Sequence, residues 1–329
     1  MFGRSAIAAA AGALVVLTGT AEGSAAADRP CTSAQACLGS FTLAEGASMP
    51  YYRSFPLAGS SAATQAVIVV HGTERNAANY FDRMVQAARD AGADSTTEII
   101  APHFQIAEDK PAAREVSWTN GDDTSWKDGG DSVSPAGISS FTVIDEILTK
   151  LADKQRFPAL TRITLAGHSA GGQFVQRYAV GGVAPAQLPG VSFRYVTANP
   201  SSYLYFTPDR PVGTGLPGSC PAYDDYKYGL NHLNAYLGEF TGDQLIKQYV
   251  TRKVTYLLGG GDVHQDHGID QSCAAETQGH YRLVRGQNYF SSIAKNYPAA
   301  PHEKVIVPGV GHDSGAMFDS SQGRAAIFG

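Results

Sequence analysis

Residues Arg162 to Gly172 read R-I-T-L-A-G-H-S-A-G-G, and this stretch decides the fold. An apolar run enters Gly167-His168-Ser169-Ala170-Gly171, and a segment that we expect to be helical follows from Gly171 to Val180. G-x-S-x-G between a strand and a helix is typical of the sharp turn that lifts a serine hydroxyl clear of a sheet. The five-residue pattern is a weak signal in a glycine-rich chain, but its strand–turn–helix setting predicts that Ser169 is a nucleophile.

Strands and helices alternate on both sides of this turn. Ala66 to Val70 is a continuous apolar run, typical of a strand buried on both faces of a parallel sheet. The other expected strands are Ile99–Ala101, Arg162–Ala166, Phe193–Ala198, Val254–Leu258 and Lys304–Val307, with short strands and turns over Phe41–Phe55. Helices are expected at Asn76–Ala91, Ile138–Phe157, Gly171–Val180, Asp243–Thr251 and Gln278–Ile293. This order predicts one α/β domain over residues 28–329, with a mostly parallel sheet and helices on both faces.

Two segments break the alternation. Residues 102–135 are rich in Gly, Asp, Ser and Trp and are expected to form a long ordered loop. Residues 199–240 hold many tyrosines, and we interpret them as a cap-like insertion over the carboxyl edge of the sheet, where ligands bind. These tyrosines either pack within the protein or line a substrate pocket. Among the candidates for substrate binding are Tyr203 and, beside the nucleophile, His168.

A serine hydroxyl needs a base, and the base needs a third group to orient it. In this kind of fold the chain order is serine, acid, histidine. His312 lies in Pro308-Gly309-Val310-Gly311-His312-Asp313, directly after the last expected strand, and is the predicted base. Val254 to Leu258 runs into Gly259-Gly260-Gly261-Asp262, so Asp262 is the predicted acid. Asp266 and Asp270 are rivals on the same loop.

Hydrolysis at an acyl carbon also needs hydrogen-bond donors for a developing oxyanion. One expected donor is the backbone N–H of Ala170, directly after the nucleophile. The second is the backbone N–H of Thr73, in the His71-Gly72-Thr73 turn that follows the strand ending at Val70. The alternative interpretation of His71-Gly72 is a plain tight turn.

The N-terminal residues predict export. Arg4 precedes an apolar run from Ala6 to Thr18, and Ala25-Ala26-Ala27 offers a cleavage site, so residues 1–27 are interpreted as a signal peptide. An uncleaved membrane anchor is the alternative, but the run is shorter than the roughly 20 residues that span a bilayer. The four cysteines then suggest two disulfides in an oxidising compartment. Three connectivities exist, of which the sequence-local one is Cys31–Cys37 and Cys220–Cys273.

Charge and spacing argue against other classes of partner. A net charge of −5 does not favour nucleic acid or an anionic membrane. The Asp262–His267 stretch lacks the spacing of a known two-histidine metal site, and no C-x2-C pair suggests zinc. The acidic residues around Trp126 lack the spacing of an EF-hand calcium loop and are more simply solvated; they are Asp122, Asp123, Asp128 and Asp131. No metal is therefore predicted.

With these residues identified, the chain resembles the α/β-hydrolase superfamily from Ala66 to the C-terminus. The motifs that carry the resemblance are V-H-G-T-E-R-N-A-A-N-Y-F (Val70 to Phe81), G-H-S-A-G-G, V-T-Y-L-L-G-G-G-D and V-P-G-V-G-H-D. They are loosely similar to secreted bacterial and fungal proteins of the polyhydroxybutyrate-depolymerase and feruloyl-esterase kind. The resemblance implies a Ser–His–Asp triad, an acyl-enzyme intermediate and no cofactor, carried here by Ser169, His312 and Asp262, with Ala170 and Thr73 as oxyanion donors.

The sequence thus predicts a secreted serine hydrolase that cleaves small or oligomeric carboxylic esters. Peptide or amide cleavage by the same residues is the alternative, and a non-catalytic protein on the same fold is a third interpretation. The sequence does not specify the acyl group, the alcohol or the oligomeric state.

Overall fold

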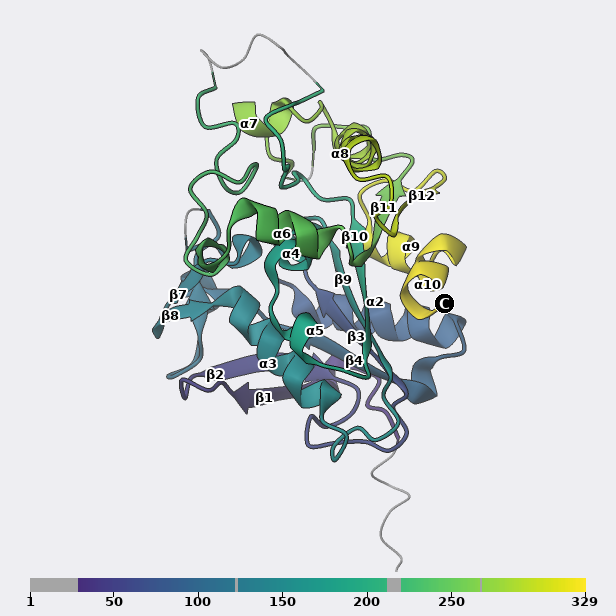
Figure 1. Cartoon of the computed structure of the whole chain (residues 1–329). Coiled ribbons are helices and arrows are strands. Elements are labelled where there is room, and N and C mark those ends of the chain that lie inside the picture. Colours follow the sequence, from purple (N-terminus) through teal and green to yellow (C-terminus); the bar gives the residue numbers. More distant parts are fainter. Residues whose placement is uncertain (1–28, 122–123, 212–219, 267) are drawn as a thin grey trace, which may run out of the picture.

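The computed structural model describes residues 29–121, 124–211, 220–266 and 268–329 (Figure 1). The segment interpreted as a signal peptide lies outside these ranges. Within them, no helix is long and apolar enough to cross a membrane.

An eight-stranded sheet forms the centre of the molecule, in the order β1-β2-β4-β3-β9-β10-β11-β12. The first two strands, β1 (Leu38–Thr42) and β2 (Ser48–Arg53), join antiparallel at one edge. The remaining neighbours pair in parallel. These strands are β3 (Gln65–Val70), β4 (Thr97–Pro102), β9 (Arg162–His168), β10 (Ser192–Ala198), β11 (Lys253–Gly259) and β12 (His302–Val307). The mostly parallel sheet is the one that the sequence predicts.

Helices cover both faces of the sheet (Figure 1). One face carries α2 (Ala77–Asp90), α9 (Ser314–Asp319) and α10 (Ser321–Phe328). The other carries α3 (Ser140–Ala152), α4 (Ala170–Gly181), α6 (Gly242–Tyr249) and α8 (Arg282–Asn296). Three four-residue helices complete the set: α1 (Ala34–Cys37), α5 (Ala184–Gln187) and α7 (Cys273–Glu276). The predicted α/β fold with two covered faces is therefore present.

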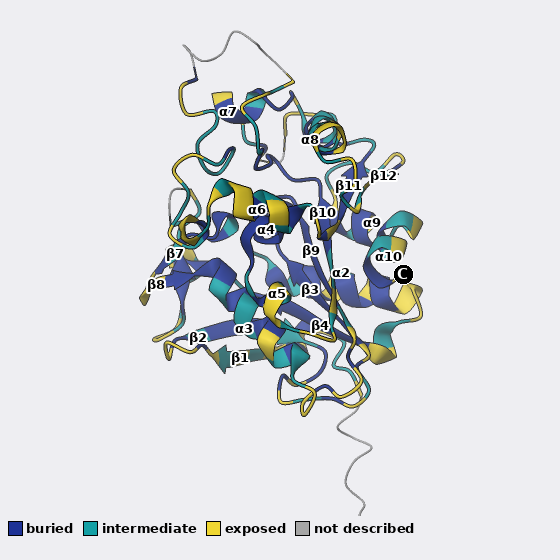
Figure 2. Ribbon diagram, in the orientation of Figure 1, coloured by how far each residue is buried: buried dark blue, intermediate teal, exposed yellow. Residues whose placement is uncertain are grey.

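Alternating side chains divide the core into two layers. In β3, Ile68 and Val70 pack in the cluster beneath α3, α4, α6 and α8, whereas Val67 and Val69 pack beneath α2, α9 and α10. Every residue of β3 is buried, which explains its unbroken apolar sequence (Figure 2). The sheet thus separates two apolar layers and contributes side chains to both.

Some element boundaries differ from those that the sequence predicts. The expected helix from Gln278 begins at Arg282, because Gly279 has a φ of +144°, which a right-handed helix cannot accommodate. The helix expected to reach Phe157 ends at Ala152, where Asp153 adopts an extended conformation. The expected loop 102–135 holds short elements: β5 (Gln105–Ile106), η2 (Ala107–Asp109), β6 (Ser117–Trp118), η3 (Trp126–Asp128) and β7 (Asp131–Val133), which pairs with β8 (Ala136–Ser139).

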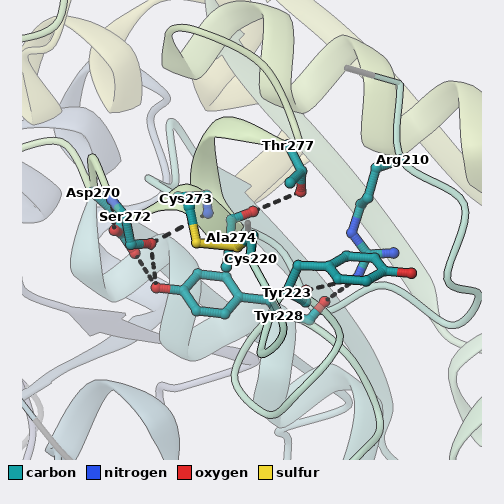
Figure 3. The surroundings of a disulfide bond; sticks show 10 residues. Arg210, Cys220, Tyr223, Tyr228, Asp270, Ser272, Cys273, Ala274 and Thr277 are labelled. Atoms are coloured by element: carbon teal, nitrogen blue, oxygen red, sulfur yellow. Dashed lines mark hydrogen bonds between the residues drawn. A yellow bond between two sulfur atoms is a disulfide. The ribbon is translucent and has the colours of Figure 1, made fainter. Parts of the chain in front are cut away.

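Both predicted disulfides are present, Cys31–Cys37 and Cys220–Cys273. The second joins the insertion 199–240 to α7, in the segment between β11 and α8 (Figure 3). Close to it, the hydroxyl of Tyr228 lies 2.7 Å from an Asp270 carboxylate oxygen and 2.9 Å from the Ser272 hydroxyl. The described part of the insertion contains one short 3-10 helix, η4 (Leu237–Glu239), and is held by such cross-links rather than by a regular element of its own.

Candidate active site

Ser169 occupies a sharp turn between β9 and α4. Its φ of 59° and ψ of −120° are unusual for a residue with a side chain, as expected for a strained nucleophile turn. A Cβ on Gly171 would lie 2.1 Å from the Val70 carbonyl oxygen, and one on Gly167 would lie 2.3 Å from the Gly171 carbonyl oxygen. Both glycines are needed because backbone passes directly against them.

The three predicted catalytic side chains form one hydrogen-bonded chain. Nε2 of His312 lies 3.0 Å from the Ser169 Oγ, and Nδ1 of His312 lies 2.8 Å from an Asp262 carboxylate oxygen. In the neutral imidazole, the N–H at Nδ1 donates to Asp262, so Nε2 is free to accept the serine proton. This arrangement is the one that nucleophile activation requires.

Asp262 has a second charged neighbour that the sequence analysis missed. The guanidinium of Arg282, at the start of α8, lies 3.5 Å from the other Asp262 oxygen, and both side chains are almost fully buried. Asp262 is therefore held between His312 and a cation. Of its two rivals, Asp270 pairs instead with Tyr228, and Asp266 offers its backbone carbonyl to Arg282. No sequence motif marks Arg282, because only the packing of α8 brings it here.

The direction of the Thr73 N–H is set by the hydrogen bonds that the Gly72 carbonyl makes, because both groups belong to the same peptide unit. Gly72 O accepts a hydrogen bond from the Arg75 N–H at 3.0 Å and lies 2.9 Å from Nδ1 of His71. In a trans peptide the carbonyl and the following N–H point in opposite directions, so the Thr73 N–H is turned away from these partners. Thr73 also lines both cavities that meet at Ser169. The peptide group is therefore fixed in orientation before substrate arrives.

His71 has a defined proton position. Its Nε2 accepts a hydrogen bond from the Phe104 N–H at 3.0 Å, so its Nδ1 carries the proton that faces Gly72 O. The ring is fully buried, and burial lowers the pKa of His71 to about 3. The imidazole consequently stays uncharged at neutral pH, and its hydrogen bonds with Gly72 O and the Phe104 N–H fix the position of the Gly72–Thr73 peptide.

Ala170 is the first residue of α4. Its N–H belongs to the free N-terminal turn of the helix, where the helix dipole favours negative charge. The two predicted oxyanion donors thus come from different elements, the turn after β3 and the start of α4. Both residues line the cavity at Ser169.

His168 lies next to His312, the predicted base. Its ring centroid is 4.4 Å from that of His312, and its Nδ1 lies 3.3 Å from the Tyr80 hydroxyl. Burial, followed by the nearby charge of His312, lowers the pKa of His168 well below its ordinary value. His168 lines the cavity at Ser169, so a contact with substrate remains a prediction for it.

The prediction for Tyr203 is wrong. Its side chain is fully buried and stacks on Tyr289 with 4.6 Å between ring centroids. It belongs to the apolar layer beneath α8 and is not among the residues that line either cavity at Ser169. The segment after β10 turns inward here because Tyr203 N donates to the Gln278 side chain and Leu204 N donates to that of Gln176.

Two cavities meet at Ser169. The first, here called the histidine cavity, measures about 490 Å³ and is lined in part by His312, His168, Arg83 and Ser314. The second, the lysine cavity, measures about 250 Å³ and is lined in part by Ala170, Gln173, Lys127 and Lys227. Both share Thr73, Ser169 and Gly268. Ser169 therefore has space on two sides, one next to His312 and one next to Ala170.

The acidic residues near Trp126 do not gather around a common point. Asp128 binds Arg177 at 2.8 Å, and Asp122 and Asp123 lie outside the described residues. Among the residues that the structure does describe, no group of three or more His, Cys, Asp or Glu side chains is arranged to hold a metal ion.

Comparison with known proteins finds similar structures but no similar curated sequence. No protein-family model and no curated protein sequence matches the chain. Among solved structures, a poly(3-hydroxybutyrate) depolymerase from Bordetella parapertussis is similar over 82% of this chain and 81% of its own, with a TM-score of 0.59 and 23% identity. A poly(aspartic acid) hydrolase-1 from Sphingomonas sp. KT-1 is similar over 89% and 98%, with a TM-score of 0.63 and 21% identity. An S-formylglutathione hydrolase from Agrobacterium tumefaciens is similar over 88% of this chain and 94% of its own, with a TM-score of 0.50 and 12% identity.

Proposed function

The chain has the α/β-hydrolase fold, and we propose that it is a serine hydrolase that cleaves carboxylic esters through an acyl-enzyme intermediate. The observation that carries this proposal is the hydrogen-bonded chain from Ser169 through His312 to Asp262 at the mouth of two cavities. Similar folds occur in proteins described as a depolymerase and as hydrolases, which supports the same reaction class here.

In the first half of the reaction, His312 Nε2 takes the proton of Ser169 as Oγ attacks the ester carbonyl carbon. The carbonyl oxygen becomes an oxyanion and accepts hydrogen bonds from the N–H groups of Thr73 and Ala170. When the C–O bond breaks, the imidazolium returns its proton to the departing alcohol. Water then attacks the acyl-serine by the same steps, which releases the acid and restores Ser169.

The two cavities take different parts of the ester. The group that protonates the departing alcohol lines only one of them, the histidine cavity, so the alcohol part belongs there. Ala170, whose N–H donates a hydrogen bond to the carbonyl oxygen, lines only the lysine cavity, so the acyl part belongs on that side. The proposal thus assigns a direction to the bound substrate.

Export completes the proposal. We infer that residues 1–27 are removed and that the mature chain begins at Asp28, outside the cytoplasm. The apolar run before Ala25-Ala26-Ala27 and the two disulfides support this inference. N-terminal sequencing of the protein recovered from the medium or periplasm is the test, and a chain that still begins at Met1 would contradict the inference.

The central test is covalent labelling with a fluorophosphonate, followed by peptide mapping, beside turnover of p-nitrophenyl acetate and a panel of peptides. We expect the label on Ser169, and ester turnover that is lost in Ser169→Ala but kept in Ser321→Ala, an exposed serine on α10. Labelling of another residue, or ester turnover by Ser169→Ala, would overturn the proposal. Turnover of peptides without esters would point to a peptidase with the same residues.

A further inference from the structure

The lining of the lysine cavity is more polar than an apolar acyl chain would require. Apart from Ala170, each described residue that lines it is a glycine or bears a polar or charged group. Asn120, Gln173 and Ser201 supply neutral polar groups, and the charged ones are Lys127, Lys227 and Asp270. Ligand sites are usually lined mainly by hydrophobic and aromatic side chains, with a few polar groups that set specificity. The lining here reverses that balance and indicates a polar acyl group.

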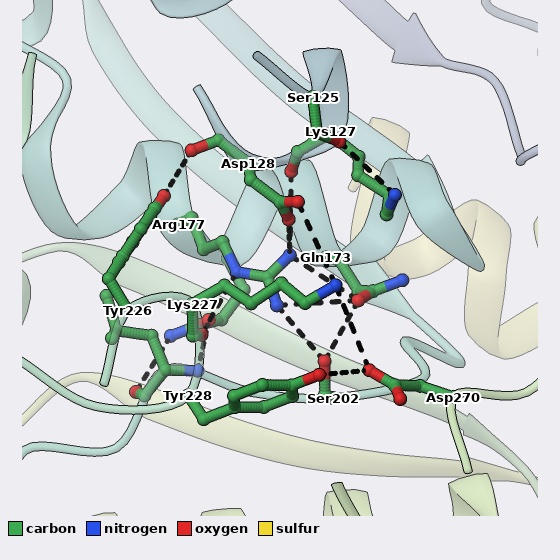
Figure 4. A network of polar contacts seen from close by, with 12 residues as sticks. Ser125, Lys127, Asp128, Gln173, Arg177, Ser202, Tyr226, Lys227, Tyr228 and Asp270 are labelled. Atoms are coloured by element: carbon green, nitrogen blue, oxygen red, sulfur yellow. Dashed lines mark hydrogen bonds and ion pairs between the residues drawn. The ribbon is translucent and has the colours of Figure 1, made fainter. Parts of the chain in front are cut away.

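Among the described residues, the charges around this cavity form ion pairs, with the exception of Lys127. Arg177 binds Asp128 at 2.8 Å, and Lys227 lies 3.9 Å from both Asp128 and Asp270 (Figure 4). Asp270 is further satisfied by the Tyr228 hydroxyl and the Ser272 N–H. Within the described residues, these two carboxylates thus face Arg177 and Lys227.

Lys127 is the remaining cation. Its ammonium donates to the Asn120 carbonyl oxygen and to the Ser125 hydroxyl at 3.2 Å, and no carboxylate of the described residues lies within ion-pair distance of it. An ammonium has three N–H donors, so one is left for a ligand. Burial is the main cause that lowers the pKa of Lys127, and the nearby cations Lys227 and Arg177 lower it further, against the opposite effect of Asp128 and Asp270.

From these contacts we propose that the lysine cavity binds a carboxylate at the far end of the acyl group, with Lys127 as the residue that receives it. The substrate class is then a half-ester of a short dicarboxylic acid, or an oligomer that presents such a unit to Ser169. This inference rests on the proposed ester hydrolysis and on the assignment of the acyl part to this cavity. A ligand carboxylate would supply an anion that none of the described residues places within ion-pair distance of Lys127.

The test compares two methyl esters of similar acyl length, monomethyl glutarate and methyl pentanoate, by release of methanol at neutral pH. We expect kcat/KM to be at least about tenfold higher for monomethyl glutarate, in line with a charge-assisted hydrogen bond. In Lys127→Gln, the ratio of the two kcat/KM values should fall roughly 10- to 100-fold, and Lys127→Arg should restore most of it. Lys247→Gln removes the same charge from an exposed position on α6 and should leave the ratio unchanged.

A second measurement uses only the wild-type protein, in case the Lys127 variants do not fold. With methyl pentanoate as substrate, glutarate should inhibit at concentrations at least about tenfold lower than pentanoate does. Equal turnover of the two esters, or equal inhibition by the two acids, would overturn the inference and leave ester hydrolysis intact. Failure to turn over either ester or p-nitrophenyl acetate would instead overturn the proposed function.

Discussion

The Asp262 carboxylate lies between the His312 imidazole at 2.8 Å and the Arg282 guanidinium at 3.5 Å. In the proposed mechanism, a buried carboxylate in this position holds the His312 ring in one tautomer and stabilises the imidazolium that forms when Ser169 loses its proton. Arg282 in turn offsets the cost of burying Asp262 before His312 is charged. The chemistry of this site therefore depends on which nitrogen of His312 carries the proton.

Asp262→Asn tests this assignment. The amide cannot accept the His312 Nδ1–H as a carboxylate does, and the opposite tautomer places a proton on Nε2, which then cannot act as base. We expect kcat for p-nitrophenyl acetate to fall by up to ~10⁴. Asp266→Asn, on the same loop, should change kcat by less than about tenfold, because His312 contacts the Asp262 side chain. A larger loss in Asp266→Asn than in Asp262→Asn would show that the acid is misassigned.

His71 predicts how stability depends on pH. Its pKa is about 3 in the folded protein, against an ordinary value of 6.5, so the unfolded chain binds one more proton between these two values. The free energy of unfolding should therefore decrease as the pH falls from about 6.5 toward 3, by up to ~1.4 kcal/mol per pH unit for this group. Urea unfolding at pH 7, 5.5 and 4 measures the slope. His71→Gln should be less stable at pH 7 but should lose less stability on acidification; an unchanged slope would refute the assignment.

At the scale of elements, α4 is pressed against the ends of β3 and β9. Its first turn lies so close to Val70 that Gly171 has no room for a side chain, and this contact brings the Ala170 N–H to the edge of the sheet. Thr73, in the turn after β3, lines the same cavity as Ala170. The proposed oxyanion site thus depends on how tightly one helix packs on two strands.

Gly171→Ala should destabilise this packing. Because the obstructing atoms are backbone carbonyls, they cannot turn aside, and the free energy of unfolding should fall by at least ~2 kcal/mol. Turnover of p-nitrophenyl acetate should fall as well, since Ala170 and Ser169 would shift. Gly238→Ala provides the control, because nothing lies within 4 Å of the added Cβ. Equal melting temperatures for the two variants would contradict the predicted close packing.

The insertion 199–240 is held to the segment before α8 by Cys220–Cys273, which closes a loop with a sequence separation of 53. In the chain-entropy model this bond contributes about 4 kcal/mol, against about 2 kcal/mol for Cys31–Cys37, whose separation is 6. The double variant Cys220→Ser/Cys273→Ser should therefore lose more stability than Cys31→Ser/Cys37→Ser. Thermal unfolding of both measures the order, and the reverse order would show that native contacts, not loop closure, dominate.

On the scale of the whole molecule, two apolar layers share one sheet. Phe174 of α4 packs in one layer and Phe81 of α2 in the other, and both are fully buried. Neither layer can open without exposing strands that the other layer also covers. This mutual dependence is the physical basis for expecting residues 28–329 to behave as one domain.

Calorimetry of the mature chain tests that expectation. We expect one unfolding transition, lowered as a whole by either Phe81→Ala or Phe174→Ala, each of which should cost about 3–5 kcal/mol. Far-ultraviolet and near-ultraviolet circular dichroism should give coincident curves. Two separated transitions, with each substitution shifting only one of them, would show that the layers are independent units.

Local sequence by itself predicted the strands of the parallel sheet, the helices α2, α3, α4, α6 and α8, and the position of the Ser169 turn, but it did not predict α9 or α10. Runs of β-branched residues, helical periodicity and glycines beside the serine act through backbone sterics and burial over a few residues, so they can be recognised without the fold. The positions of Asp262 and His312 followed from the chain order of such folds. The sequence-local disulfide pairing was also confirmed.

Only the tertiary structure decided which side chains meet. Asp262, Asp266 and Asp270 look alike on one loop, and it is the path of the backbone that turns the first toward His312. Tyr203 is of a residue type that often lines pockets, yet its side chain packs in the core. The sequence does not reveal this, because an irregular segment has no periodicity that distinguishes buried from exposed positions. Arg282 and Lys127 reach the site from segments remote in sequence. Arg282 meets Asp262, and Lys127 lines the lysine cavity, only through tertiary packing, which no local pattern encodes.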